Sequence, residues 1–131
     1  FNAKGIALDQ ITTSDPLTEG TNAGRGFAVS GGVAKAVKDL ILKEHPGTEV
    51  KVQAAEGLKN CKTMLMMAKA GRLNGYLLEG MACPGGCVAG AGTLQPINKS
   101  SALVKKYATE NDKKDADESA YGDRLHELSE H

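Results

Sequence analysis

The 131-residue chain is predicted to form an α/β fold, a small parallel sheet flanked by helices. Between residues 33 and 92, segments with helical spacing of apolar residues alternate with short strand-like segments. Strands that alternate with helices pair in parallel, because each helix carries the chain back across the sheet. Ligands of such sheets gather at the carboxyl ends of the strands, so a site is expected at that edge.

The first part of the chain is rich in turn-forming residues. Residues 2–10 are predicted to form a short helix. The text "TTSDPLTEGTNAGR" at residues 12–25 reads as a loop. Residues 27–29 fit either a short strand or an extended loop.

The middle of the chain gives the strongest secondary-structure patterns. Apolar residues recur at helical spacing over 33–44, and a His-Pro-Gly run ends that helix. Residues 50–54 alternate as a strand does. A second helix is predicted from residue 58 to about residue 70, where a glycine ends it. The apolar run at 75–79 is interpreted as a buried strand.

The last part of the chain is predicted to hold two more helices. Ser100 is expected to cap a helix after Pro96. Residues 109–119 form a charged linker, and residues 120–131 fit a C-terminal helix. The length suits one domain over residues 1–131.

Composition excludes some classes of function. The chain carries 16 basic and 16 acidic residues without a basic block, so no nucleic-acid or anionic-membrane partner is expected. No apolar run reaches the roughly 18 residues of a membrane-spanning helix, and no signal-peptide pattern opens the chain. Three cysteines do not form a disulfide framework, which favours a reducing, cytoplasmic location.

Two of the three cysteines lie in the stretch "EGMACPGGCVAGAGTL" at residues 79–94. Cys83 is interpreted as the last residue before a helix, with Pro84 in the first turn and Cys87 on the same side. Helix-start amides favour thiolates and other anions. Gly85 and Gly86 would let an object lie close to the backbone. The pattern favours an anionic metal–sulfur cluster over a bare zinc ion, while a redox dithiol and incidental cysteines stay open.

The other potential ligands are expected to have structural roles. Cys61 lies on the apolar face of its helix and is interpreted as a small core residue. His45, His126 and His131 are expected to be solvated or to cap helices. Cys83 and Cys87 therefore stand alone as a candidate ligand pair.

The sequence of residues 79–94 resembles the third cysteine motif of the iron-only [FeFe]-hydrogenases. That motif joins Met-Ala-Cys to Gly-Gly-Cys and ends in glycines and Gln-Pro. The text "GFAVSGGVAKAV" at 26–37 resembles the family's Phe-containing loop before a Gly-Gly helix, and "SSALVKKY" at 100–107 resembles its following helix. The resemblance implies a fragment of the C-terminal lobe of the hydrogenase catalytic domain.

In that family the catalytic H-cluster is a [4Fe-4S] cubane joined through a cysteine sulfur to a two-iron subsite with carbon monoxide, cyanide and a dithiolate bridge. The resemblance implies that Cys83 binds the cubane, and that Cys87 binds the cubane and bridges to the subsite. Met81 and Phe27 would line the subsite pocket. The implied activity is the reversible reduction of protons to H2, with a redox donor such as ferredoxin.

Some residues depart from the family pattern. Ala91 replaces a glycine, Thr93 and Leu94 are inserted, and Ala28 stands where the family usually has glycine. These changes suggest a divergent subgroup with an altered potential or a sensory role. The family's other two cysteine motifs would lie upstream of Phe1. We therefore expect a C-terminal piece that is inactive alone and covers its open sheet edge by self-association or with its own tail.

Two alternatives belong to other functional classes. One is a non-catalytic iron–sulfur protein of the prelamin-recognition-factor-like group, which keeps a cubane and lacks the two-iron subsite. Gly-Gly before Cys87 favours the hydrogenase, because that group typically has Ser-Gly. The other alternative is a thiol redox or zinc-binding module in which the two loop thiols act alone.

Overall fold

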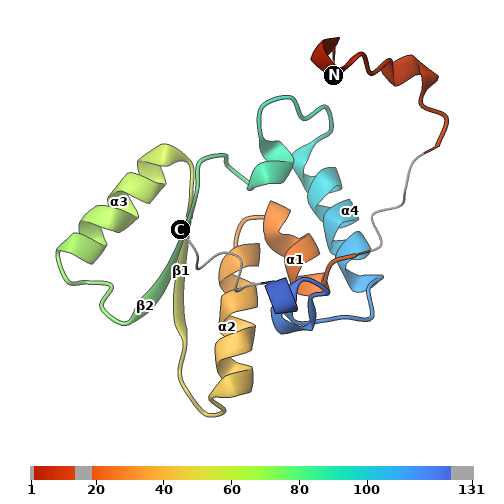
Figure 1. Cartoon of the computed structure of the whole chain (residues 1–131). Helices are drawn as coiled ribbons and strands as arrows, with labels where there is room; N and C mark the ends of the chain where they lie inside the picture. The colour runs from red at the N-terminus through yellow and green to blue at the C-terminus, as the bar shows by residue number, and fades with distance from the viewer. Residues whose placement is uncertain (1, 14–18, 125–131) are drawn as a thin grey trace.

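The computed structural model describes residues 2–13 and 19–124, and it forms an α/β fold (Figure 1). The helices are α1 (Asn22–Arg25), α2 (Gly32–Glu44), α3 (Leu58–Lys69) and α4 (Ile97–Thr109), and the strands are β1 (Lys51–Glu56) and β2 (Tyr76–Met81). Short 3₁₀ turns complete the set: η1 (Asn2–Lys4), η2 (Leu8–Gln10), η3 (Gly26–Ala28), η4 (Cys87–Ala89) and η5 (Ala116–Glu118).

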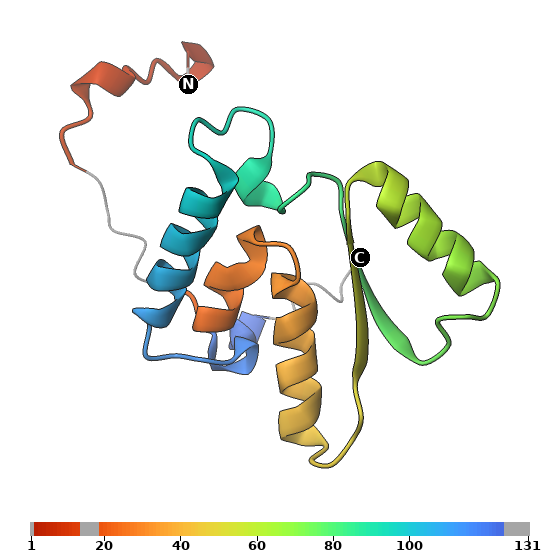
Figure 2. The ribbon, with the colours of Figure 1, turned by 180° about the vertical axis from the view of Figure 1, so that it is seen from behind.

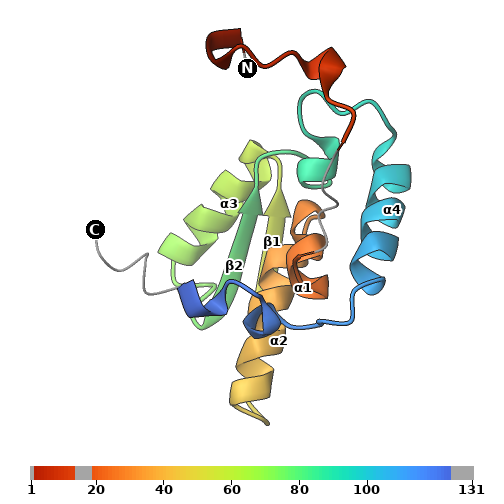
Figure 3. The same cartoon turned by 45° about the vertical axis from the view of Figure 1, so that its right-hand side comes forward.

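The two strands form a parallel sheet, as the sequence predicts. Their register runs from Lys51 opposite Tyr76 to Glu56 opposite Met81. Helix α3 connects the strands, and α2 lies on the other side of the sheet (Figures 1 and 2). Both strands point toward the loop that carries the two cysteines (Figure 3). The candidate site therefore lies at the carboxyl edge of the sheet, where parallel sheets place ligands.

The core is small and built largely from small side chains. Among the described residues, no large side chain is fully buried. The buried apolar residues are Ala34, Ala36, Met64, Leu73, Val88 and Ala108. Within α3, Met64 is buried and Cys61 is half-buried, whereas Leu65 is 59% exposed. The inward face of α3 is thus centred on Met64.

Helices α1 and α4 form a further layer beyond α2. The Arg25 guanidinium donates a hydrogen bond to the Tyr107 carbonyl at 2.9 Å and lies 3.9 Å from the centre of the Tyr107 ring. The N–H groups of Asn22 and Ala23 donate to the carbonyls of Lys113 and Lys114 at 2.7 and 3.0 Å. The segment predicted as a loop at 12–25 therefore contains a helical turn bound to the predicted linker.

Several sequence predictions about local structure are wrong. Residues 27–29 are predicted as a short strand or an extended loop, but Phe27 and Ala28 lie in η3, because the Val29 N–H donates to the Gly26 carbonyl at 3.2 Å, and only Val29 is extended. Gly5, with φ +65°, separates η1 from η2 where one helix was predicted. Helix α4 begins at Ile97, so Ser100 lies within its first turn and donates its N–H to the Pro96 carbonyl at 3.0 Å. Most of the predicted helix at 120–131 lies outside the described residues.

No helix in the described ranges is both long and apolar enough to cross a membrane. The predictions about self-association and about the tail are not tested by the structure of a single chain.

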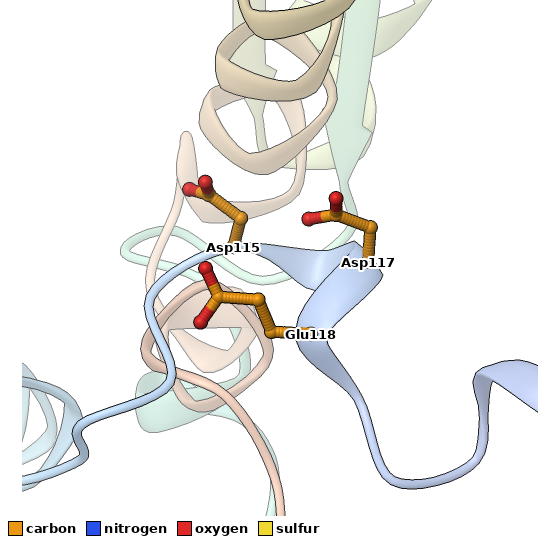
Figure 4. Close-up of side chains that lie close together, drawn as sticks. All are labelled: Asp115, Asp117 and Glu118. Atoms are coloured by element: carbon orange, nitrogen blue, oxygen red, sulfur yellow. The ribbon is translucent and has the colours of Figure 1, made fainter.

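Three carboxylates gather around η5, with ligand oxygens within 4.8 Å of one another: Asp115, Asp117 and Glu118 (Figure 4). Lys43 of α2 donates to both carboxylate oxygens of Asp117 at 2.8 and 3.1 Å and lies 3.2 Å from Asp115. Glu118 accepts the Lys114 N–H at 2.8 Å. The cluster therefore ties the end of α2 to the segment after α4.

The ion pair between Lys43 and Asp117 predicts that the stability of the fold depends on pH. The hydrogen bond from Lys43 lowers the pKa of the Asp117 carboxyl below its ordinary value of 3.8. A lowered folded-state pKa contributes stability above the ordinary pKa, and that stability is lost as the pH falls through the lowered value. Lys43→Met should return the Asp117 pKa toward 3.8 in an NMR titration. Lys35→Met is the control, because Lys35 pairs with Asp39 instead and should leave Asp117 unchanged.

Candidate functional site: the cysteine loop

The cysteine loop, residues 82–90, begins with a tight turn. The Gly86 N–H donates to the Cys83 carbonyl at 3.0 Å. Pro84 and then Gly85, with φ +89°, occupy the central positions, which is the residue pattern of a type II turn. Gly86 also has φ +92°. The predicted helix start at Pro84 is therefore wrong: two successive left-handed glycines interrupt a right-handed helix, and only the η4 turn follows, from Cys87.

The two loop thiols differ from the third cysteine in their surroundings. Cys83 is half-buried, Cys87 is exposed, and neither forms a disulfide. The Cys61 thiol instead donates to the carbonyls of Ala55 and Met81, both at 3.5 Å. Cys61 is thus engaged with the two strands, as its predicted structural role requires. In the described part of the chain, no third His, Cys, Asp or Glu joins the loop thiols in a compact three-ligand group.

Gly86 is the point where three segments meet. A Cβ on Gly86 would lie 2.6 Å from the Ser30 nitrogen, 2.7 Å from the Ala28 oxygen and 3.0 Å from the Met81 sulfur. The Ser30 N–H also donates to the Gly85 carbonyl at 3.2 Å. The segment just after Phe27 and the cysteine loop, assigned to one site on sequence grounds, are therefore in direct contact.

The predicted pocket residues lie on either side of this contact. Met81 ends β2 and is half-buried, with its sulfur close to Gly86. Phe27 lies in η3, one residue before Ala28, and is 41% exposed. The Met81 side chain therefore lies against the cysteine loop, and Phe27 directly precedes a residue whose backbone contacts the loop.

Gly85 is held from two further directions. Its N–H donates to the Glu56 carboxylate at 2.8 Å. A Cβ on Gly85 would lie 2.7 Å from the Ile97 side chain at the start of α4. The ends of β1 and β2, the start of α4 and the segment before α2 therefore all converge on this turn.

A second carboxylate links β2 to α2. Glu79 is 7% exposed and accepts the Val33 N–H at 3.2 Å through Oε1. Its Oε2 is buried and has no hydrogen-bond partner among the described residues. The N-terminus of a helix favours negative charge, so Glu79 stabilises the start of α2. Sequence reasoning missed both Glu56 and Glu79, although charged residues in short strand segments could have drawn attention to them.

The family of this chain follows from its sequence match over the same region. Residues 1–91 match the family model described as iron only hydrogenase large subunit, C-terminal domain. The chain belongs to this family. The resemblance of the cysteine motif is thereby confirmed, and the fold suits a fragment of this hydrogenase domain.

Curated relatives of two kinds are similar to this hydrogenase domain. The periplasmic [Fe] hydrogenase large subunit of Nitratidesulfovibrio vulgaris is 47% identical over 92 residues, covering 70% of this chain and 20% of the relative. A probable cytosolic Fe-S cluster assembly factor of Drosophila sechellia is 33% identical, covering 73% and 18%. The nuclear prelamin A recognition factor of Xenopus laevis is 30% identical, covering 46% and 13%. The chain thus spans about a fifth or less of the length of these relatives.

The loop fits one part of an iron–sulfur site, the kind of cofactor that the family implies. Free thiols at Cys83 and Cys87 are the soft donors that iron–sulfur clusters take. A Cβ on Gly90 would lie 3.8 Å from the Cys83 sulfur, so a glycine there keeps the surroundings of that thiol open. Two thiols are half of the four that a cubane normally takes.

The close approach at Gly86 predicts a specific loss of stability. Gly86→Ala should destabilise the fold by about 2–5 kcal/mol, because backbone strain adds to overpacking against fixed backbone atoms. Gly92→Ala is a matched control, since Gly92 has φ +87° but nothing within 4 Å of its Cβ position. It should lose only the strain energy, about 1–2 kcal/mol. Urea unfolding measures both; equal losses would contradict the packing of the loop described above.

Proposed function

We propose that Cys83 and Cys87 are ligands of the H-cluster of an [FeFe]-hydrogenase that reversibly reduces protons to H2. The observation that carries this proposal is a pair of free thiols on a glycine turn held against the segment after Phe27. The similarity of 47% over 92 residues to a hydrogenase large subunit supports the same assignment. When bound, the cluster supplies the redox chemistry, and the protein supplies ligands, a pocket and orientation.

The two thiols receive different roles in this proposal. Cys83, which is half-buried, would hold the cubane, and Cys87, which is exposed, would hold both the cubane and the two-iron subsite. The exposure of Cys87 supports a sulfur shared between two centres, because a shared sulfur needs open space on two sides. Gly85 and Gly86 let Ile97 and the segment before α2 pack against the turn, which positions the thiols. Met81 and Phe27 line the subsite pocket.

The rest of the site comes from a longer polypeptide. A cubane normally takes four cysteine thiolates, and Cys61 is engaged with the strands. We propose that a segment upstream of this chain supplies the missing ligands, and that a redox donor such as ferredoxin delivers electrons. A cytoplasmic location stays a prediction; the hydrogenase relative carries the name of a periplasmic protein.

A non-catalytic iron–sulfur protein is the second candidate. Its support is the similarity to the probable Fe-S cluster assembly factor and to the prelamin A recognition factor. Infrared spectra of the complete polypeptide separate the two functions, because only the H-cluster carries carbon monoxide and cyanide. Those bands together with slow turnover would indicate a sensory hydrogenase, and a cubane without them would favour the second candidate.

We predict that this chain alone evolves no H2, because it offers two loop thiols where a cubane takes four. The test is gas chromatography with a reduced dye after reconstitution with iron and sulfide. H2 formation at an enzyme-like rate would contradict the prediction.

In the complete polypeptide, Cys87→Ala should abolish activity and remove the infrared bands of the two-iron subsite. Cys61→Ala is the matched control: it removes a thiol that contacts the carbonyls of Ala55 and Met81 instead of standing in the cysteine loop, so the bands should persist. Met81→Leu should cost less activity than Cys87→Ala, because it keeps the side-chain volume and removes only the sulfur. Equal losses from Cys87→Ala and Cys61→Ala would refute the ligand assignment.

A further inference from the structure

The carboxylate of Glu56 lies against the middle of the cysteine loop. Glu56 is the last residue of β1, and its Oε2 accepts the N–H of Gly85 at 2.8 Å. Gly85 is two residues from Cys83 and two from Cys87. A charge-assisted hydrogen bond of this length holds its partners firmly. The Glu56 carboxylate is therefore bound to the residue that lies midway in sequence between the two cysteines.

Two further contacts hold the end of β1 against the loop region. The Gly57 N–H donates to the Met81 carbonyl at 2.8 Å, which fixes the strand ends side by side. A Cβ on Gly57 would lie 3.8 Å from the Pro84 ring. These contacts fix the backbone next to Glu56. The hydrogen bond to Gly85 therefore requires only the Glu56 side chain to be ordered.

The charge of Glu56 has no basic counterpart in the described part of the chain. Each ion pair found there joins other residues. Glu56 is half-buried as a residue, so solvent screens its charge less than that of a fully exposed side chain. Glu56 thus holds a carboxylate without an ion-pair partner among the described residues against the turn that joins the two cysteines.

We propose that Glu56 is a positioning residue of the cysteine loop that also lowers the reduction potential of the cluster held by Cys83 and Cys87. This inference rests on the proposed function. Adding an electron makes the cluster more negative, and a nearby carboxylate opposes that change. Hydrogen bonds to cluster sulfurs are one of the terms that set the potential. While Glu56 accepts the Gly85 N–H, that N–H is not available to a cluster sulfur, so both effects would act in the same direction.

Two substitutions separate the effects. Glu56→Gln keeps a side-chain acceptor for the Gly85 N–H and removes the charge. Glu56→Ala removes both and leaves the N–H free. Glu49→Gln is the matched control, because Glu49 precedes the opposite end of β1, about 20 Å away at the rise of an extended chain. Glu49 is exposed and lies 3.9 Å from Lys51.

The first arm of the test uses this chain without metal and measures the hydrogen exchange of the Gly85 amide by NMR. Glu56→Ala should speed exchange about tenfold, the effect of losing a hydrogen bond worth about 1.4 kcal/mol. Glu56→Gln should have a smaller effect, and Glu49→Gln none. The β1–β2 strand amides report whether the fold is kept. Unchanged exchange at Gly85 in a folded Glu56→Ala variant would overturn the positioning role.

The second arm uses the complete polypeptide with its cluster and a redox titration followed by electron paramagnetic resonance. At a fixed ambient potential near the midpoint, Glu56→Gln should raise the ratio of reduced to oxidised cubane about three- to tenfold, and Glu56→Ala at least as much. Glu49→Gln should leave the ratio unchanged. An unchanged ratio in Glu56→Gln would overturn the effect on potential and leave the proposed function intact. A wild-type polypeptide that binds no cluster would overturn the proposed function, and the effect on potential would fall with it.

Discussion

The missing side chain at Gly86 is the constraint on which the site depends. Backbone atoms of Ser30 and Ala28 and the sulfur of Met81 occupy the space that any Cβ would need. A hydrogen bond contributes about 0.5–1.5 kcal/mol net, whereas a contact under 3.0 Å with backbone forces whole segments apart. The close approach at Gly86 therefore outweighs any single hydrogen bond in deciding where the cysteine loop lies relative to the segment before α2.

The remaining contacts fix the orientation of the cysteine loop at this close approach. Ser30 donates to the Gly85 carbonyl from one side, and Glu56 accepts the Gly85 N–H from the other. The peptide groups of this turn are thus bound to two elements that are far apart in sequence. Glu79 fixes the start of α2 to β2 through Val33, so the segment that contacts Gly86 is tied to the same strand that delivers Cys83. A shift of β2 or of the segment before α2 would therefore also shift the two loop thiols.

Periodicity predicts the parts of this arrangement that follow from local sequence. The apolar spacing of α2 and α3 and the two strands was sufficient to place the cysteines at the carboxyl edge of a parallel sheet. The Pro84-Gly85 turn was also readable, since proline followed by glycine is typical of a type II turn, but the helix interpretation overrode it. The roles of Glu56 and Glu79 were not readable, because their partners lie 29 and 46 residues away and depend on the strand register. The turn at α1 rests on Thr21, whose hydroxyl accepts the Gly24 N–H at 3.0 Å within a segment that looks like a loop.

The small core makes these backbone contacts more important. Half of the buried apolar residues in the described ranges are alanines of α2 and α4, and apolar side chains on α3 such as Leu58 stay exposed. Small side chains let elements approach closely, but they bury little apolar surface, which is the main source of folding energy. The order of the cysteine loop therefore depends on close packing at its glycines and on two carboxylates more than on a large hydrophobic core. A loop fixed in this way can hold its backbone in place while one of its thiols, that of Cys87, stays exposed.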